Sequence, residues 1–185
     1  MVKKENQRIA LTKRMLQEGL LRLLETKDLD KISVTELCRE SGINRATFYN
    51  HYSSPQDLLM DLEAQMSDEL TEILGDPQSV EEISRQTEAA CAYLQEHARY
   101  VITLYQCHAD GDLETVFSEL NRNFHNESQR LKKKTSMDAD SIHLVSTFLC
   151  TGCYHLIREW LIRDIQKTPK EISDLLLRIV SKELL

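Results

Sequence analysis

Residues 33–52 read SVTELCRESGINRATFYNHY, a stretch with start signals for two short helices and a glycine between them. Ser33 stands three residues before Glu36, which is the spacing of a capping box, so we expect a helix to begin there with mutual hydrogen bonds between the two residues. Gly42 supplies a turn residue free of Cβ strain, and Asn44 is a favoured N-cap for the next helix. The order of helix, glycine turn and helix predicts a helix-turn-helix.

The second of these two helices has an apolar side and a polar side. Phe48 and Tyr52 are four residues apart and share one face, which we expect to join a small core. The remaining side chains are polar or small: Arg45, Ala46, Thr47, Tyr49, Asn50 and His51. Their donors suit phosphates and base edges, so this face is expected to enter the major groove of DNA. The alternative is a motif used for packing alone, but it gives no reason for Arg45, Tyr49 and His51 to lie outward together.

Helix signals continue along the rest of the chain. Leucines spaced for one helix face within residues 9–26 predict a first helix. Pro55 falls in the first turn of a fourth helix that is expected to end near Leu74. The 5 glycines and 3 prolines are few for this length, and about nine helices with no convincing strand predict an all-α fold. The later helices are expected to begin at Ser79, near His97, at Gly111, near residue 138 and at Thr168.

Charge is unevenly distributed along the 185 residues. The formal net charge is −7, yet residues 1–52 hold 10 Lys and Arg against 7 Asp and Glu, while residues 53–185 hold 13 against 23. Any positive potential for nucleic acid therefore lies in the N-terminal part. No apolar run is long enough to span a bilayer and no signal peptide is evident, so we expect a cytoplasmic protein without membrane contact.

Enzymatic and metal-binding motifs are weak or missing. The chain has no nucleophile elbow, P-loop or HExxH motif, so we expect no catalytic residues, no cofactor and no enzyme. Cys150, Cys153 and His155 invite a metal or redox interpretation, but the second cysteine pair typical of zinc sites is missing. These residues are expected to belong to a helical core, as are most of the five cysteines.

The stretch from Thr12 to Leu58 resembles the DNA-binding domain of the TetR/AcrR-type transcriptional regulators. The motifs that carry this resemblance are Ser33-Val34-Thr35-Glu36-Leu37-Cys38, Ser41-Gly42-Ile43 and Arg45-Ala46-Thr47-Phe48-Tyr49-Asn50-His51-Tyr52. The resemblance implies a three-helix helix-turn-helix DNA-binding domain in residues 1–53. It further implies a larger helical ligand-binding and dimerisation domain in residues 54–185, where a weaker resemblance rests on the segments at Gly152–His155 and Arg158–Leu161.

The resemblance also assigns roles to individual residues. Arg45 is the candidate for base reading, because its fork can bind guanine O6 and N7, with Thr47 and Asn50 beside it. Phosphate contacts are expected from Lys13, Ser33, Tyr49 and His51, and Ala46 lies on the same face. One departure from the family is that Pro55 stands where a phosphate-binding lysine is common.

The implied function is a homodimeric, ligand-responsive transcription regulator, expected to be a repressor, that binds a near-palindromic double-stranded DNA operator. The last two helices would form the dimer, and a small-molecule effector, neither identified nor assigned to residues, would bind the helical domain. The alternative is a co-activator of the same fold that binds a partner protein instead of DNA, which the acidic bulk and Pro55 favour. An all-helical enzyme is a third and weaker interpretation.

Overall fold

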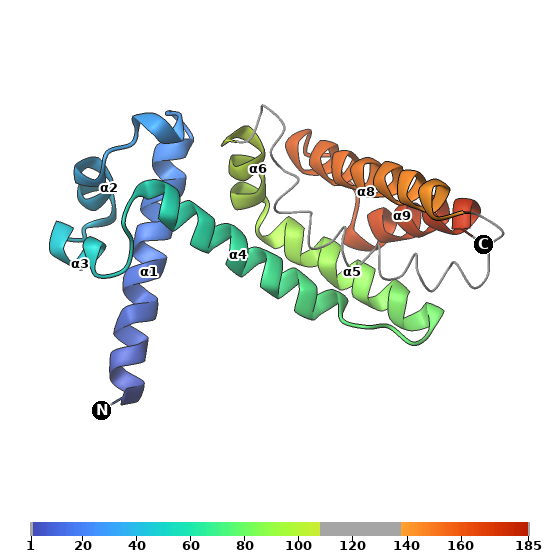
Figure 1. The fold of residues 1–185 in the computed structure, drawn as a ribbon, viewed down its shortest axis with the longest axis horizontal. Coiled ribbons are helices and arrows are strands. Elements are labelled where there is room, and N and C mark those ends of the chain that lie inside the picture. Colours follow the sequence, from blue (N-terminus) through green and yellow to red (C-terminus); the bar gives the residue numbers. More distant parts are fainter. Residues whose placement is uncertain (1, 108–137, 185) are drawn as a thin grey trace. The chain divides into compact units, whose positions relative to one another are not determined.

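The computed structural model describes residues 2–107 and 138–184, and every regular element in those ranges is helical (Figure 1). The predicted all-α fold is therefore confirmed. The helix expected to begin at Gly111 lies outside the described residues. In chain order the elements are α1 (Val2–Leu24), the short 3₁₀ helix η1 (Leu29–Lys31), α2 (Val34–Ser41), α3 (Arg45–Tyr49), α4 (Pro55–Leu74), α5 (Val80–Glu96), α6 (Ala98–Cys107), α8 (Ala139–Ile162) and α9 (Pro169–Leu184).

The chain divides into two compact units, Met1–Met66 and Ser67–Leu185. The division falls inside α4, so the first half of this helix belongs to the first unit and the second half to the second. The predicted boundary between residues 53 and 54 precedes α4 and therefore differs from the division between the two compact units, which falls between Met66 and Ser67.

The first unit is built from α1, α2, α3 and the first half of α4. Helix α2 packs against α1 and against α3. The leucine stripe predicted on the first helix is buried, with Leu16 and Leu20 at 0% exposure. Leu37 of α2, Phe48 of α3 and Leu58 of α4 are also 0% exposed, so each of the four helices contributes to the core of this unit. Burying these large apolar side chains supplies most of the driving force that holds the four helices together.

Gly19 allows α1 and α2 to approach closely. A Cβ atom at this position would lie 2.9 Å from Cβ of Ser41 and 3.2 Å from its backbone N and Cα atoms. These distances are shorter than van der Waals contact, so the helices could not keep their separation with any larger residue there. The hydroxyl of Ser41 donates to the carbonyl of Leu37 at 2.7 Å, which satisfies this buried polar group inside its own helix.

The helix starts agree with the sequence in most details. Oγ of Ser33 accepts the backbone N–H of Glu36 at 3.2 Å, as predicted for the start of α2. The reciprocal bond from Ser33 to Glu36 was wrongly predicted, because the Glu36 carboxylate instead forms an ion pair with Lys27. The capping box at Thr168 is complete: Oε2 of Glu171 accepts the Thr168 N–H at 2.9 Å, and Oγ1 of Thr168 accepts the Glu171 N–H at 3.2 Å.

The second unit contains the second half of α4 together with α5, α6, α8 and α9. Helix α5 packs along α9, while α8 contacts both α6 and α9. The core includes Cys91 and Leu94 of α5, Leu149 and Trp160 of α8, and Ile172 of α9. Nε1 of Trp160 donates to the carbonyl of Lys167 at 3.1 Å, which ties the connection between α8 and α9 to the core.

None of the helices in the described ranges is long and apolar enough to cross a membrane.

Candidate nucleic-acid interface

Two local features place α3 after the turn. Gly42 adopts φ +68°, a left-handed conformation that glycine tolerates and that ends α2. The N–H of Ile43 then donates to the Cys38 carbonyl at 3.0 Å, which closes the turn. Oδ1 of Asn44 accepts the N–H of Thr47 at 2.8 Å and starts α3 as predicted. The turn therefore fixes the direction in which α3 leaves α2.

The buried side of α3 is formed by Phe48 and continued by Tyr52, which lies just beyond the helix. Phe48 is 0% and Tyr52 4% exposed, and their ring centroids are 6.1 Å apart. The N–H groups of His51 and Tyr52 both donate to the Phe48 carbonyl at 2.9 Å, so the chain continues the helical turn beyond Tyr49. These two aromatic rings set the rotation of α3 and thereby decide which of its side chains face solvent.

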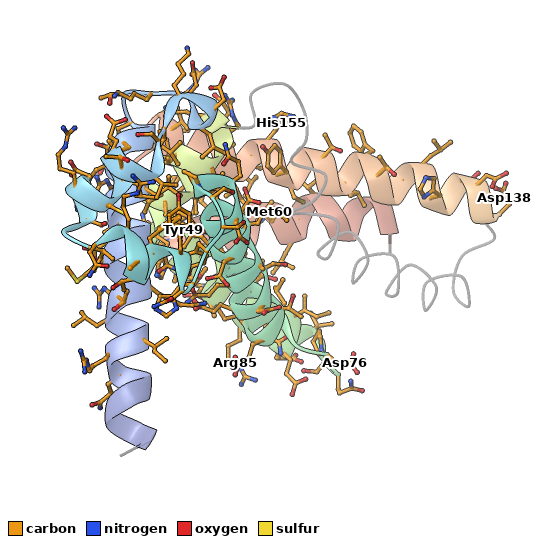
Figure 2. The ribbon with its side chains drawn as sticks, turned by 60° about the vertical axis from the view of Figure 1, so that its left-hand side comes forward. Tyr49, Met60, Asp76, Arg85, Asp138 and His155 are labelled. Atoms are coloured by element: carbon orange, nitrogen blue, oxygen red, sulfur yellow. The ribbon has the colours of Figure 1, made fainter. Side chains whose placement is uncertain are left out.

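The opposite side of α3 carries the residues predicted to bind DNA. Arg45, Ala46, Tyr49 and Asn50 are exposed, and Thr47 and His51 are half-buried. Tyr49 is 52% exposed, which is unusual for a large aromatic side chain (Figure 2). The structure thus places all six on the part of α3, and of the turn that follows it, not buried in the core. This surface, composed of Arg45, Ala46, Thr47, Tyr49, Asn50 and His51, is called the recognition surface below.

Arg45 and Tyr49 are neighbours on this surface. They are one helical turn apart, and Cζ of Arg45 lies 6.0 Å from the centroid of the Tyr49 ring. At this distance a guanidinium is attracted to the face of an aromatic ring. The contact restrains the arginine side chain while leaving it exposed, which lowers the entropy it must lose on binding a ligand.

Ser33 lies at the exposed N-terminus of α2. Its Oγ accepts the Glu36 N–H, so the oxygen is used in capping while the O–H hydrogen can still donate. The partly positive end of a helix together with a hydroxyl donor suits a phosphate oxygen.

The ammonium group of Lys13 is paired with side chains of the same protein. Its Nζ lies 3.0 Å from Oδ2 of Asp61 on α4 and 5.4 Å above the ring of Tyr52. Asp61 also accepts a hydrogen bond from the Tyr52 hydroxyl at 2.7 Å. Burial disfavours the charged carboxylate, but the hydrogen bonds from Tyr52 and Lys13 outweigh it and lower the pKa of Asp61. Sequence reasoning missed Asp61, because the contact joins positions 48 residues apart and leaves no local pattern.

Pro55 is buried in the first turn of α4. Oγ of Ser54 accepts the N–H of Asp57 at 3.1 Å, and the Asp57 carboxylate accepts the N–H of Ser53 at 2.7 Å. This helix start is therefore built from a proline and a carboxylate, and Pro55 offers no donor for a phosphate.

The cysteines whose side chains the structure describes are packing groups. Cys38 and Cys91 are buried and Cys153 is half-buried. Burial raises the pKa of all three thiols, that of Cys91 to about 12, so they stay protonated at neutral pH. Within the described ranges no three His, Cys, Asp or Glu side chains come together as a metal site, and the side chain of Cys150 lies outside what the structure describes.

Two family models match this chain. Residues 18–62 match "Bacterial regulatory proteins, tetR family", and residues 81–182 match "Transcriptional regulator C-terminal region". The first match covers the recognition surface, and the second covers more than half of the chain. The protein therefore belongs to the TetR family of transcriptional regulators.

Known proteins with similar sequences or folds are regulators too. An uncharacterised HTH-type transcriptional regulator, YxbF of Bacillus subtilis (strain 168), is 33% identical over 94 residues, which are 50% of this chain but only 25% of that protein. The fold is similar to that of Thermus thermophilus FadR, a TetR family repressor solved with lauroyl-CoA, at a TM-score of 0.60 and 15% identity over 94% of this chain and 95% of that one. It is similar also to the dihydroxyacetone kinase operon activator DhaS, at a TM-score of 0.60 and 15% identity over 94% and 96%.

Proposed function

We propose that this TetR-family regulator is a dimeric repressor that binds a near-palindromic DNA operator and releases it when a small-molecule effector binds the second unit. The observation that carries the proposal is the recognition surface. Arg45 and Tyr49 are exposed on a helix whose opposite face is buried through Phe48 and Tyr52. A helix fixed in this way can lie in the major groove with its polar side toward the bases.

Each residue of the recognition surface has a role that fits its chemistry. Arg45 would bind a guanine edge with its two-pronged guanidinium, and Thr47 and Asn50 would contact neighbouring bases. Tyr49 and His51 would donate to phosphates, and so would Ser33 with the start of α2. Ala46 is small enough to let the helix backbone approach the groove.

An apolar face on α8 supports a dimer. Leu144 is 68% and Phe148 71% exposed. They are followed at helical spacing by Gly152, which is also exposed, and by the exposed His155, which is labelled in Figure 2. A Cβ atom built at Gly152 would meet no atom of the described residues within 4 Å. Small and apolar residues on one helix face let a second helix pack closely, so we assign this face, with Leu175 and Ile179 of α9, to the dimer contact.

Release of DNA by an effector is the proposed regulatory step. The T. thermophilus repressor of similar fold was solved with lauroyl-CoA. In this chain the two compact units share one continuous helix, α4. A ligand that prefers one conformation of the second unit would change operator affinity by its differential affinity for the two states.

The decisive experiment is selection of binding sites from a pool of random duplex DNA by the purified protein. We expect an inverted repeat to be enriched, with affinity that falls as salt rises. Arg45→Ala should weaken binding by about 1–3 kcal/mol and relax the preference at one base pair of each half-site. Arg85→Ala, an exposed arginine on α5, is the matched control and should bind like the wild type.

The second candidate function is a co-activator that binds a partner protein. Pro55 at the start of α4 favours it, because a donor for phosphate is missing there, and DhaS, of similar fold, is an operon activator. This function predicts that no DNA sequence is enriched by the folded protein and that Arg45→Ala leaves transcriptional activity unchanged.

A further inference from the structure

The Asp61 carboxylate joins three parts of the first unit. Oδ2 of Asp61, on α4, accepts hydrogen bonds from the Tyr52 hydroxyl at 2.7 Å and from Nζ of Lys13 at 3.0 Å. Lys13 belongs to α1, whereas Tyr52 lies three residues beyond the end of α3. One oxygen atom of α4 is therefore connected both to the first helix and to the end of the recognition helix α3. Lys13, Tyr52 and Asp61 are called the Asp61 cluster below.

The contacts of Tyr52 transmit the position of Asp61 to α3. The Tyr52 ring is 4% exposed and packs against Phe48, while its backbone N–H donates to the Phe48 carbonyl. Phe48 is the buried residue that sets the rotation of α3. A shift of α4 that moved Asp61 would have to break the bond to Tyr52 or carry the end of α3 with it.

The same cluster already provides two partners for the ammonium group of Lys13. This group has an anion at ion-pair distance and an aromatic ring beneath it, and the side chains of Lys13 and Asp61 are each 38% exposed. Asp61 already neutralises this ammonium group, so a DNA phosphate that approached Lys13 would lie close to a second negative charge. Lys13 is thus better placed to hold α4 than to bind DNA.

We propose that Asp61 is a positioning residue for DNA binding, which fixes the end of α3 through Tyr52 and keeps Lys13 away from the phosphates. This inference rests on the proposed DNA-binding function. Asp61 would act without touching DNA, and its effect would appear in affinity through the geometry of the recognition surface. It also makes the first half of α4 part of the DNA-binding unit.

The test measures the affinity of the full-length protein for the duplex enriched in the selection, by fluorescence anisotropy. Tyr52→Phe removes only the hydroxyl, Asp61→Leu removes both bonds, and Asp61→Asn keeps an acceptor for Tyr52. The matched control is Gln17→Ala. Gln17 donates to Gln65 at 3.2 Å, so this control removes a bond between α1 and α4 one turn further along, with no connection to α3.

We expect Tyr52→Phe and Asp61→Leu to weaken DNA binding by roughly 3- to 10-fold, since each removes a hydrogen bond that involves a half-exposed charged group. Asp61→Asn should weaken binding less than Asp61→Leu, and Gln17→Ala should have no effect. Thermal unfolding of each variant shows whether it is folded at the temperature of the binding assay.

Salt dependence provides a second measurement that a purely structural role would not affect. A residue that contacts one phosphate contributes about 0.9 to the slope of log affinity against log salt. We expect Lys13→Met to leave this slope unchanged, because the ammonium group of Lys13 is paired with Asp61 and not with a phosphate.

Different results separate this inference from the proposed function. If the wild type binds the duplex while Tyr52→Phe and Asp61→Leu bind equally well, the inference is wrong and DNA binding stands. A slope reduced by about 0.9 in Lys13→Met would assign Lys13 to a phosphate and also overturn the inference. A wild type that binds no duplex DNA overturns both.

Discussion

Gly19 sets the distance between α1 and α2 through the absence of a single side chain. Gly19→Ala would place a methyl group 2.9 Å from Cβ of Ser41, and the nearby backbone atoms of Ser41 cannot rotate away. We expect a loss of about 1–3 kcal/mol in the free energy of unfolding, the usual cost of overpacking a tight contact. Urea denaturation followed by circular dichroism measures this loss.

Arg14→Ala is the matched control for Gly19→Ala. Arg14 lies on the same helix, its side chain is 77% exposed, and its pair with Glu18 is of the surface type that contributes less than about 0.5 kcal/mol. Equal denaturation midpoints for Gly19→Ala and the wild type would mean that α1 and α2 can separate at no cost, contrary to the packing described above.

The position of a residue in the fold could be predicted from the sequence where that position depends on its immediate neighbours. The outward position of Arg45 and Tyr49 followed from the four-residue spacing of Phe48 and Tyr52, and Gly42 followed from its place between two helix signals. Gly19 and Asp61 escaped prediction, because their partners Ser41 and Lys13 come from other helices. Distant pairs of this kind leave no periodic signal in one sequence.

At the scale of elements, local chemistry predicted helix starts well and helix extent less well. The side chains of Ser33, Asn44, Ser79 and Thr168 all cap the helices that they were expected to begin. Helix α1 begins at Val2, well before residue 9, and η1 at Leu29–Lys31 was not predicted. The sequence before residue 9 gives no helix-start signal, and although Asp28 stands directly before η1, its side chain makes no capping hydrogen bond there.

The start of α9 should make part of the stability depend on pH. Hydrogen bonds from the Thr168 backbone and side chain, with the charge of Lys167 adding to them, lower the pKa of Glu171. A lowered pKa in the folded state means that the unfolded chain takes up the proton first as pH falls. The stabilisation is therefore present at neutral pH and is lost as pH falls through the lowered pKa of Glu171.

We expect Glu171→Gln to unfold at a lower temperature than the wild type at pH 7, and the difference to shrink as pH falls below the ordinary pKa of glutamate and to vanish below the lowered pKa of Glu171. Thermal unfolding at a series of pH values measures this difference. Glu81→Gln, in the first turn of α5, is the control, because the Glu81 carboxylate accepts no hydrogen bond from the described residues. A difference between Glu171→Gln and the wild type that stays constant with pH would contradict the linkage.

At the scale of the whole molecule, the exposed face of α8 matters because a palindromic operator requires two recognition helices at a fixed spacing. Phe148 is 71% exposed on a helix that also buries Leu149 and Trp160 in the core. The apolar residues of α8 therefore exceed what the described residues of its own unit cover, which is typical of a helix that packs against a second copy.

Phe148→Glu should convert the proposed dimer into a monomer, because it places a charge in an apolar contact without a partner. Light scattering after size-exclusion chromatography measures the mass directly, and Val80→Glu is the control, since Val80 is 75% exposed but lies in the first turn of α5 and not on the α8 face that contains Phe148. The monomer should also have much lower affinity for the operator. Each half-site would then be bound separately, without the high effective concentration that a dimer gives its second DNA-binding unit. A wild-type monomer would exclude the proposed dimer. A Phe148→Glu variant that remains a dimer would assign the dimer contact to other exposed apolar residues. Neither result would change the assignment of the recognition surface.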